Sequence, residues 1–289
     1  LIQNGYKVDV YEKNDRAGGL MIYGIPNFKL DKKIVERRTE WLTDSGVVFN
    51  LNTEVGKNIS FQDLEKDYDA ILIATGVYKA RQLDIDTSTV NNSIPALDFL
   101  IESNRTGLGD SPSKNKYLTA KDKHVGVIGG GDTAMDCVRT AIRQQAKEVT
   151  CLYRRNKENM PGSAREVLNA EQEGIKFNWL SVPSKIISDS ATATSMTYKV
   201  ATLGEVDESG RRKPIDTGVE KQIKSDLIIQ ALGFEPEDLN HNFKTNIELT
   251  SWKTVKVDFK KFQTSNPKIF AAGDIVRGAS LVVWAIHDG

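Results

Sequence analysis

Residues 125–134, Val-Gly-Val-Ile-Gly-Gly-Gly-Asp-Thr-Ala, decide the fold of this chain of 289 residues. The first four are apolar or small and predict a β-strand. The helix predicted to follow carries Ala134, Val138, Ala141 and Ile142 on one face. Between strand and helix stands the pattern G-x-G-x-x-A. A strand, a glycine turn and a helix in this order are typical of a Rossmann-like dinucleotide-binding domain.

The glycine turn has the residue types that a pyrophosphate needs. Gly129 allows the tight turn, Gly131 lets the backbone approach the phosphates, and Ala134 lets the helix lie close to the strand. The free amides of the first helical turn then bind the anion with the help of the helix dipole. The predicted ligands are Gly129, Gly130, Gly131, Asp132 and Thr133. Asp132 is expected to cap the helix and to point away from the phosphates. The alternative is a tight strand–helix junction that binds nothing.

The next predicted strand, residues 149–153, is followed by Arg154 and Arg155, which lie 23 and 24 residues after Gly131. Sites that prefer NADH usually carry Asp or Glu here. A guanidinium suits the 2′-phosphate of NADPH instead. We therefore expect NADPH as the nucleotide, with NADH possible and a solvated arginine pair as the alternative. Arg165 is a weaker candidate for the same phosphate.

A second set of strands lies near the start of the chain. Residues 7–11 alternate and predict a strand that ends at Glu12, which is either an acceptor for an adenosine ribose or an ordinary surface residue. A loop with Gly18 and Gly19 follows, then a helix over residues 32–45 and a strand over 49–51. The apolar run 70–74, closed by Gly76, predicts a parallel strand covered on both faces.

The second half of the chain changes its pattern twice. Residues 103–122 are polar and aperiodic, which predicts a domain boundary. Alternation over residues 196–230, with a turn at 208–210, predicts an antiparallel meander. Two further buried strands are predicted, over 226–231 and 268–272.

Composition excludes several classes of protein. Lys and Arg number 39 and Asp and Glu number 39, so the net charge of zero argues against nucleic acid or an anionic membrane as a partner. No run approaches the roughly 18 apolar residues of a membrane span. Cys137 and Cys151 are not in C-x-x-C spacing and are expected to be structural, and the three histidines show no metal spacing. We expect a cytoplasmic protein.

Both ends of the sequence have the pattern of an incomplete helix. Residues 1–5 predict the last turn of a helix with a Gly cap, and residues 281–289 predict a helix cut short. We therefore expect a fragment of a longer polypeptide.

The chain also resembles, along its whole length, the glutamate synthase small (β) subunit family. The resemblance is carried by these segments, in order: Tyr11-Glu12-Lys13, Gly18-Gly19-Leu20, Tyr23-Gly24-Ile25-Pro26, Phe28-Lys29-Leu30, Ala74-Thr75-Gly76, residues 129–136, Tyr153-Arg154-Arg155, Asn159-Met160-Pro161-Gly162-Ser163, Phe270-Ala271-Ala272-Gly273-Asp274 and residues 280–285. Parts are shared with the FAD/NADPH module of dihydropyrimidine dehydrogenase.

The resemblance implies an α/β fold of two Rossmann-like domains, with the NADPH domain inserted into an FAD domain. With the polar break, it places a truncated first part of the FAD domain at residues 1–106, the NADPH domain at 107–250 and the second part of the FAD domain at 251–289. The family's first FAD glycine loop and its cluster-binding cysteines would precede residue 1. A protein that starts at Leu1 is therefore expected to hold FAD poorly.

The resemblance also implies an activity. The family transfers a hydride from NADPH to FAD and passes electrons through 4Fe-4S clusters to a large (α) subunit, which makes L-glutamate. No catalytic side chain is expected, because the flavin accepts the hydride. A related NADPH:acceptor flavoprotein (dihydropyrimidine dehydrogenase-like or ferredoxin-coupled) or a non-catalytic nucleotide-binding regulatory protein are the alternatives.

Residue by residue, the resemblance implies further cofactor contacts. Glu12 matches the ribose acceptor, and Gly19-Leu20 the loop against the flavin. Gly76 lets a strand end approach FAD, and Gly273-Asp274 meet the ribityl–pyrophosphate region. The remaining matches are Lys29 near the FAD phosphates, Val55 near the adenosine, Leu281 and Val282 near the isoalloxazine edge, Arg154 and Arg155 at the 2′-phosphate, and Ala231 and Gly233 near the nicotinamide.

Overall fold

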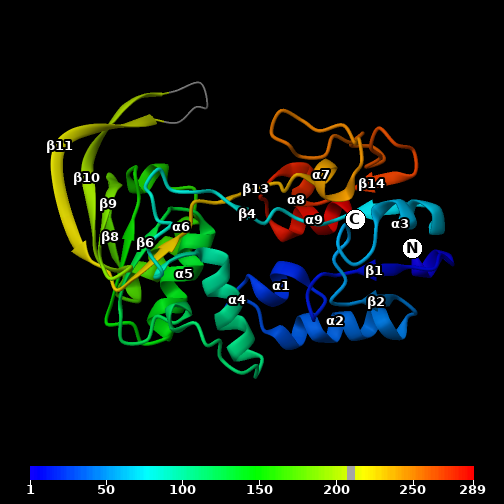
Figure 1. Cartoon of the computed structure of the whole chain (residues 1–289), viewed down its shortest axis with the longest axis horizontal. Helices are drawn as coiled ribbons and strands as arrows, with labels where there is room; N and C mark the ends of the chain where they lie inside the picture. The colour runs from blue at the N-terminus through cyan, green and yellow to red at the C-terminus, as the bar shows by residue number, and fades with distance from the viewer. Residues whose placement is uncertain (207–211) are drawn as a thin grey trace. The chain divides into compact units, whose positions relative to one another are not determined.

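The structure, a computed structural model, describes residues 1–206 and 212–289. The chain folds into two compact units (Figure 1). The first unit comprises Leu1–Gly19, Val35–Arg81 and Phe234–Gly289, and the second comprises Leu20–Ile34 and Gln82–Gly233.

The second unit is built on a five-stranded parallel sheet. Its strand order is β5 (Ser93–Pro95), β12 (Leu227–Gln230), β6 (His124–Ile128), β7 (Glu148–Leu152) and β8 (Lys176–Asn178). Alternate residues of the sheet face opposite layers. Val127 and Cys151 pack under the helices α4 (Ala96–Gly107), α5 (Asp132–Arg143) and α6 (Ala164–Gln172). Cover on both faces explains why β6, β7 and β12 are mostly apolar instead of alternating.

The opposite face of the parallel sheet is covered by a second, antiparallel sheet. Its order is β11 (Arg212–Lys224), β10 (Thr192–Val206) and β9 (Ser181–Asp189). Met196 and Tyr198 of β10 pack on Ile128 and Ile228 of the parallel sheet. The predicted meander is confirmed, but its strands lie between Ser181 and Lys224 rather than over residues 196–230, because residues 227–230 form β12 of the parallel sheet. The turn predicted at 208–210 lies outside the described residues.

The first unit contains two short parallel strand pairs. β1 (Asp9–Tyr11) pairs with β2 (Val48–Asn50), and β3 (Ile71–Ile73) pairs with β14 (Ile269–Ala271). Its apolar core joins β3 and β14 to α3 (Phe61–Asp67), α7 (Leu239–Phe243) and α8 (Asp274–Arg277). Within it, the rings of Phe61 and Phe243 stack with centroids 5.1 Å apart. The predicted cover of the 70–74 run on both faces is wrong, because Leu72, which points away from this core, is 49% exposed.

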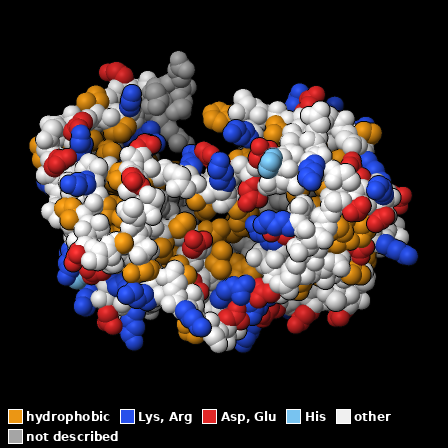
Figure 2. Space-filling model, in the orientation of Figure 1, with side chains coloured by type: hydrophobic (Ala, Val, Ile, Leu, Met, Phe, Trp, Pro, Cys, Tyr) orange, Lys and Arg blue, Asp and Glu red, His pale blue; other side chains and the backbone are white. Residues whose placement is uncertain are grey.

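The first unit also contains an antiparallel strand pair. β4 (Lys79–Ala80) pairs antiparallel with β13 (Phe234–Glu235), where the chain leaves and re-enters the first unit. The other elements are the 3-10 turns η1 (Ile2–Asn4), η2 (Lys116–Leu118) and η3 (Lys157–Asn159), and the helices α1 (Gly19–Tyr23), α2 (Lys32–Asp44) and α9 (Val282–Asp288). On the face drawn in Figure 2, basic and acidic side chains are interspersed.

The units do not coincide with the predicted boundaries at 106/107 and 250/251. Residues 20–34 and 82–106 belong to the second unit, and residues 234–250 to the first. The physical reason is packing: Phe99 of α4 is fully buried in the core under the parallel sheet. The Asn104 side chain also donates to the Tyr23 carbonyl over 2.8 Å. The polar break therefore begins within α4 and lies inside one unit instead of separating two.

Candidate nucleotide-binding sites

The glycine turn of the second unit lies where β6 meets α5. Gly129 has φ 143°, and a Cβ there would lie 2.1 Å from the Ala231 carbonyl oxygen. Ala231 in turn donates its backbone N–H to Ile128 over 2.8 Å. Only glycine fits such a close approach of two strand ends. The predicted residues Gly129 and Ala231 are thus brought together.

The next two glycines differ in their surroundings. A Cβ at Gly130 would lie 2.4 Å from the ring of Tyr153. Gly131, by contrast, has nothing within 4 Å of a Cβ position, and it is the N-cap of the 12-residue α5. The side of Gly131 is therefore open at the helix N-terminus, which fits the approach of a pyrophosphate. Gly233, beyond the end of β12, is open in the same way and has φ 88°.

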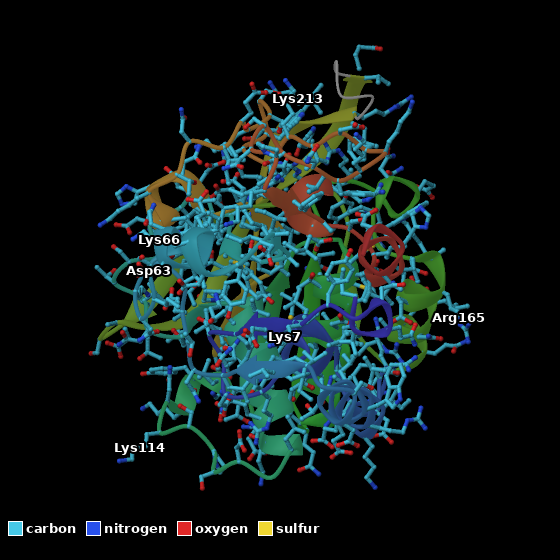
Figure 3. All side chains as sticks on the ribbon, turned by 90° about the vertical axis from the view of Figure 1, so that its right-hand side faces the viewer. Lys7, Asp63, Lys66, Lys114, Arg165 and Lys213 are labelled. Atoms are coloured by element: carbon cyan, nitrogen blue, oxygen red, sulfur yellow. The ribbon has the colours of Figure 1, made fainter. Side chains whose placement is uncertain are left out.

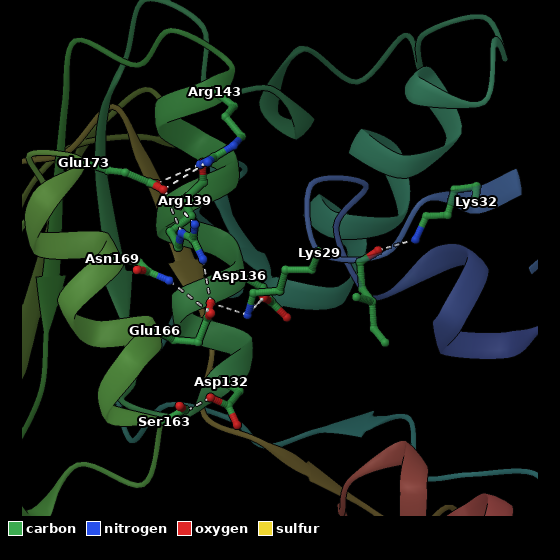
Figure 4. Close-up of polar contacts among 11 residues, drawn as sticks. Lys29, Lys32, Asp132, Asp136, Arg139, Arg143, Ser163, Glu166, Asn169 and Glu173 are labelled. Atoms are coloured by element: carbon green, nitrogen blue, oxygen red, sulfur yellow. Dashed lines mark hydrogen bonds and ion pairs between the residues drawn. The ribbon is translucent and has the colours of Figure 1, made fainter. Parts of the chain in front are cut away.

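A segment far along the chain is tied to this turn (Figure 4). Gly162 donates its backbone N–H to the Gly130 carbonyl over 2.9 Å, and Ser163 donates to Asp132 Oδ1 over 2.9 Å. Asp132 therefore does not cap α5 as expected; its carboxylate holds the start of α6. The Asn-Met-Pro-Gly-Ser segment that carries the resemblance thus has a structural role that sequence analysis missed, because the contact spans 31 residues.

Charged side chains hold α6 against α5. Arg139 contacts Glu173 and Glu166 over 2.7 Å each, and Arg143 contacts Glu173 over 2.8 Å. The hydrogen bond from Arg143, opposed by burial and reinforced by Arg139, lowers the pKa of Glu173 to about 2. The Glu173 side chain is only 23% exposed. This network fixes the two helices whose N-termini carry Gly131 and Ser163.

We expect Glu173→Gln to destabilise the protein by roughly 1.5–3 kcal/mol at pH 7, since hydrogen bonds to a charged group are lost. Because the pKa of Glu173 is lower in the folded protein than its usual 4.5, its contribution is present above pH 4.5 and lost as pH falls towards 2. Denaturant unfolding from pH 8 to pH 3 should show the gap between wild type and variant narrowing below pH 4.5.

The control for this prediction is Glu171→Gln on the same helix. Glu171 pairs with Lys157, whose side chain is 49% exposed. A surface pair contributes about 0–1 kcal/mol. Equal losses in the two variants, or a Glu173→Gln loss that does not change with pH, would contradict the role given to the network.

The two arginines after β7 have different environments. Arg155 is 6% exposed, and its Nε donates to the Arg212 carbonyl of β11 over 2.7 Å. Arg154 is exposed. Arg165, in the first turn of α6, is also exposed and extends outward (Figure 3). The two arginines predicted to act together therefore differ: Arg155 is bound to the meander, and Arg154 lies at the surface.

Lys29 and Lys32 are both engaged within the second unit (Figure 4). Lys29 Nζ lies 2.5 Å from Asp136 and 2.6 Å from Glu166, so its charge is matched by carboxylates here rather than available to a phosphate. Burial, opposed by Lys29, raises the pKa of Asp136 to about 6. Lys32 Nζ donates to the carbonyls of Met21 and Ile25, and burial lowers the pKa of Lys32 to about 8.

The predicted FAD residues of the first unit follow the carboxyl ends of its strands. Glu12 follows β1, Gly76 follows β3 with φ 71°, and Gly273 follows β14 with φ 76°. Asn14 donates to Glu12 Oε1 from its backbone over 2.8 Å and from its side chain over 2.7 Å. Among the described residues, Glu12 Oε2 has no hydrogen-bond donor, so a carboxylate oxygen fixed by Asn14 is left for a ribose hydroxyl, which fits FAD.

The other residues predicted to contact FAD lie in varied surroundings. Burial raises the pKa of Asp274, which begins α8. Val55 packs beside the core of the first unit. Leu281 and Val282 are 59% and 40% exposed at the start of α9. Leu20, like Lys29, belongs to the second unit.

Both cysteines are fully buried within the second unit, and burial raises the pKa of both thiols, that of Cys151 to about 12. In residues 1–206 and 212–289, no group of three or more His, Cys, Asp or Glu side chains could hold a metal ion. No helix in the described part of the chain is long and apolar enough to cross a membrane.

Comparison with known proteins agrees with this geometry. Residues 1–289 match the pyridine nucleotide-disulphide oxidoreductase family. The glutamate synthase [NADPH] small chain of Azospirillum brasilense is 50% identical over 293 residues, and a putative glutamate synthase [NADPH] small chain of Cereibacter sphaeroides is 52% identical over 291. Each match covers 100% of this chain, but 61% and 70% of those relatives.

The fold is shared more widely. Mycobacterium tuberculosis FprA, solved in complex with NADPH, superposes with a TM-score of 0.75 at 18% identity, over 97% of this chain and 75% of that one. This likeness shows the α/β, Rossmann-like fold alone. The whole-chain matches show more: the chain belongs to the pyridine nucleotide-disulphide oxidoreductase family, in the group that contains the glutamate synthase small chains.

Proposed function

We propose that this chain is the part of an NADPH-dependent glutamate synthase small subunit that binds NADPH and FAD and transfers a hydride from the one to the other. The observation that carries the proposal is the Gly129–Gly131 turn, with its open side at Gly131 facing the N-terminus of α5. Identity of about one half to proteins named as NADPH-dependent small chains supports it.

On the NADPH side, the amides of residues 131–133 bind the pyrophosphate. Arg154 binds the 2′-phosphate through charge-assisted hydrogen bonds. Arg155, which sequence analysis placed in the same clamp, supports it by fixing the end of β7 to β11 through the Arg212 carbonyl. Ala231 and Gly233 end the strand beside the turn and leave space for the nicotinamide half.

On the FAD side, the oxygen of Glu12 that Asn14 leaves unpaired accepts from the adenosine ribose. Gly19, Gly76, Gly273 and Asp274 border the rest of the cofactor. FAD, when bound, supplies the acceptor for the hydride. The protein contributes alignment, so no side chain is given an acid or base role.

The complete protein would pass electrons to a glutamate synthase large (α) subunit, which forms two L-glutamate from 2-oxoglutarate and glutamine. The 4Fe-4S clusters of this route would use cysteines outside these residues, since both cysteines of the chain are buried in the second unit. The chain spans about three fifths of the Azospirillum relative, so the route and the partner are proposals for the whole protein.

Flavin spectroscopy on the complete protein tests the proposed function. We expect bound FAD whose visible absorbance is bleached by NADPH under anaerobic conditions. Addition of 2-oxoglutarate and glutamine, with the co-purifying large subunit, should restore the absorbance and yield glutamate. Absence of FAD, or FAD that NADPH cannot bleach, would overturn the proposal. Bleaching without glutamate formation would limit it to an NADPH:acceptor module.

A further inference from the structure

Tyr78 occupies a place in the first unit that sequence analysis did not mark. It lies five residues after the end of β3, beyond Gly76. A Cβ at Gly76 would meet the Tyr78 ring at 3.1 Å, and a Cβ at Gly19 would lie 3.5 Å from the Tyr78 hydroxyl. The ring therefore sits between the glycine loop that follows β1 and the end of β3. Gly76 makes room for this ring as well as for a cofactor.

A cation covers the ring of Tyr78. Lys13 Nζ lies 4.6 Å from the ring centroid, a distance typical of a cation–π contact. Since Lys13 directly follows Glu12, the contact joins the end of β1 to Tyr78. Gly76 and Lys13 thus flank the ring, and Gly19 lies beside its hydroxyl.

The hydroxyl of Tyr78 is left without a partner in this arrangement. It makes no hydrogen bond to any residue in the described part of the chain. Burial, together with the nearby carboxylates of Glu12, Asp274 and Glu237, raises the pKa of Tyr78 to about 12. The hydroxyl is therefore protonated at physiological pH and can donate one hydrogen bond. An unpaired donor in a half-buried place is unfavourable unless a ligand accepts from it.

We propose that Tyr78 positions FAD by donating a hydrogen bond to an oxygen of the chain that links the flavin ring to the adenosine. The placement supports this acceptor, because the neighbours of Tyr78 are the residues proposed for the two ends of that chain: Glu12 for the adenosine ribose, Gly19 for the flavin, and Asp274 for the ribityl–pyrophosphate region. The inference rests on the proposed function, since it takes FAD as the ligand of the first unit.

Tyr78→Phe in the complete protein tests the role of Tyr78. The variant keeps the ring that Lys13 and Gly76 flank, so the apoprotein should unfold at the same temperature as wild type. Loss of one hydrogen bond to a charged or polyhydroxyl chain should raise the dissociation constant of FAD by about 10-fold. Flavin fluorescence quenching during titration of the apoprotein measures this constant. Tyr6→Phe is the control, because Tyr6 is 63% exposed in the same unit.

A second readout, the absorbance spectrum of bound FAD, separates the possible outcomes. The absorbance maxima of bound FAD should be the same in wild type and variant, because the donor contacts the linking chain and not the isoalloxazine. A shifted spectrum, or an unchanged dissociation constant, would overturn the role given to Tyr78. A wild-type apoprotein that binds no FAD at all would instead overturn the proposed function, so the two failures are distinguishable.

Discussion

Replacing Arg154 by Ala in the complete protein should raise the Michaelis constant for NADPH by about 10- to 100-fold, because charge-assisted hydrogen bonds to the 2′-phosphate are lost. NADH has no such phosphate, so its constant should change little. The loss for NADPH should shrink as salt is added, since Arg154 is exposed and screened by ions. Steady-state kinetics with both nucleotides, at low and high salt, measure the effect.

The structure supplies a contrasting variant in the neighbouring residue. Arg155 is buried and holds the Arg212 carbonyl over 2.7 Å. Arg155→Ala should therefore lower the stability of the protein and weaken NADPH and NADH alike. If Arg154→Ala also weakened both nucleotides equally, Arg154 would support the fold or the shared pyrophosphate, and the preference for NADPH would lose its basis.

Local patterns predicted the centre of the second unit well. Residues 125–134 predicted a strand, a glycine turn and a helix. β6 begins one residue before the predicted strand and ends where it was expected to end, and α5 follows the glycine turn. The pattern works here because apolar periodicity reflects burial on known faces. The same argument missed β9, an outer strand that contains Pro183 and lacks regular alternation.

Domain boundaries could not be predicted from local pattern. The polar stretch 103–122 looked like a linker, yet the helix before it is buried through Phe99 and Leu100 in the core of the second unit. Membership of a unit depends on contacts between distant segments, which composition does not record. Lys29 illustrates the same limit, since its partners Asp136 and Glu166 lie more than 100 residues away.

At the candidate sites, the sequence predicted the backbone turn better than the side-chain contacts, for the same reason. The place of Gly129 and Gly131 between a strand and a helix followed from spacing, because the geometry of such a turn is local. The hydrogen bond from Arg155 to the Arg212 carbonyl and the place of Tyr78 could not be predicted from the sequence, because each depends on a neighbour that is distant along the chain. Sequence therefore indicates where the glycine turns lie more reliably than it indicates which side chains the fold places beside them.

Replacing the first glycine of the turn by alanine should strongly lower the stability of the protein, whereas the same change at the third glycine should barely affect it. Gly129→Ala should destabilise the protein by at least about 3 kcal/mol, because the new Cβ would lie 2.1 Å from the Ala231 backbone at φ 143°. Gly131→Ala should leave stability within about 1 kcal/mol of wild type. Gly131 has nothing within 4 Å of a Cβ, and its φ of −89° suits any residue.

The matched pair separates support of the fold from contact with the nucleotide. The methyl group of Gly131→Ala would enter the space left for the pyrophosphate, so NADPH and NADH should both bind about 10-fold or more weakly. Denaturant unfolding and nucleotide titration of the two variants measure the two effects independently. If Gly131→Ala bound both nucleotides as well as wild type, the open side of Gly131 would not be the pyrophosphate site, and the nucleotide would have to approach α5 from another direction.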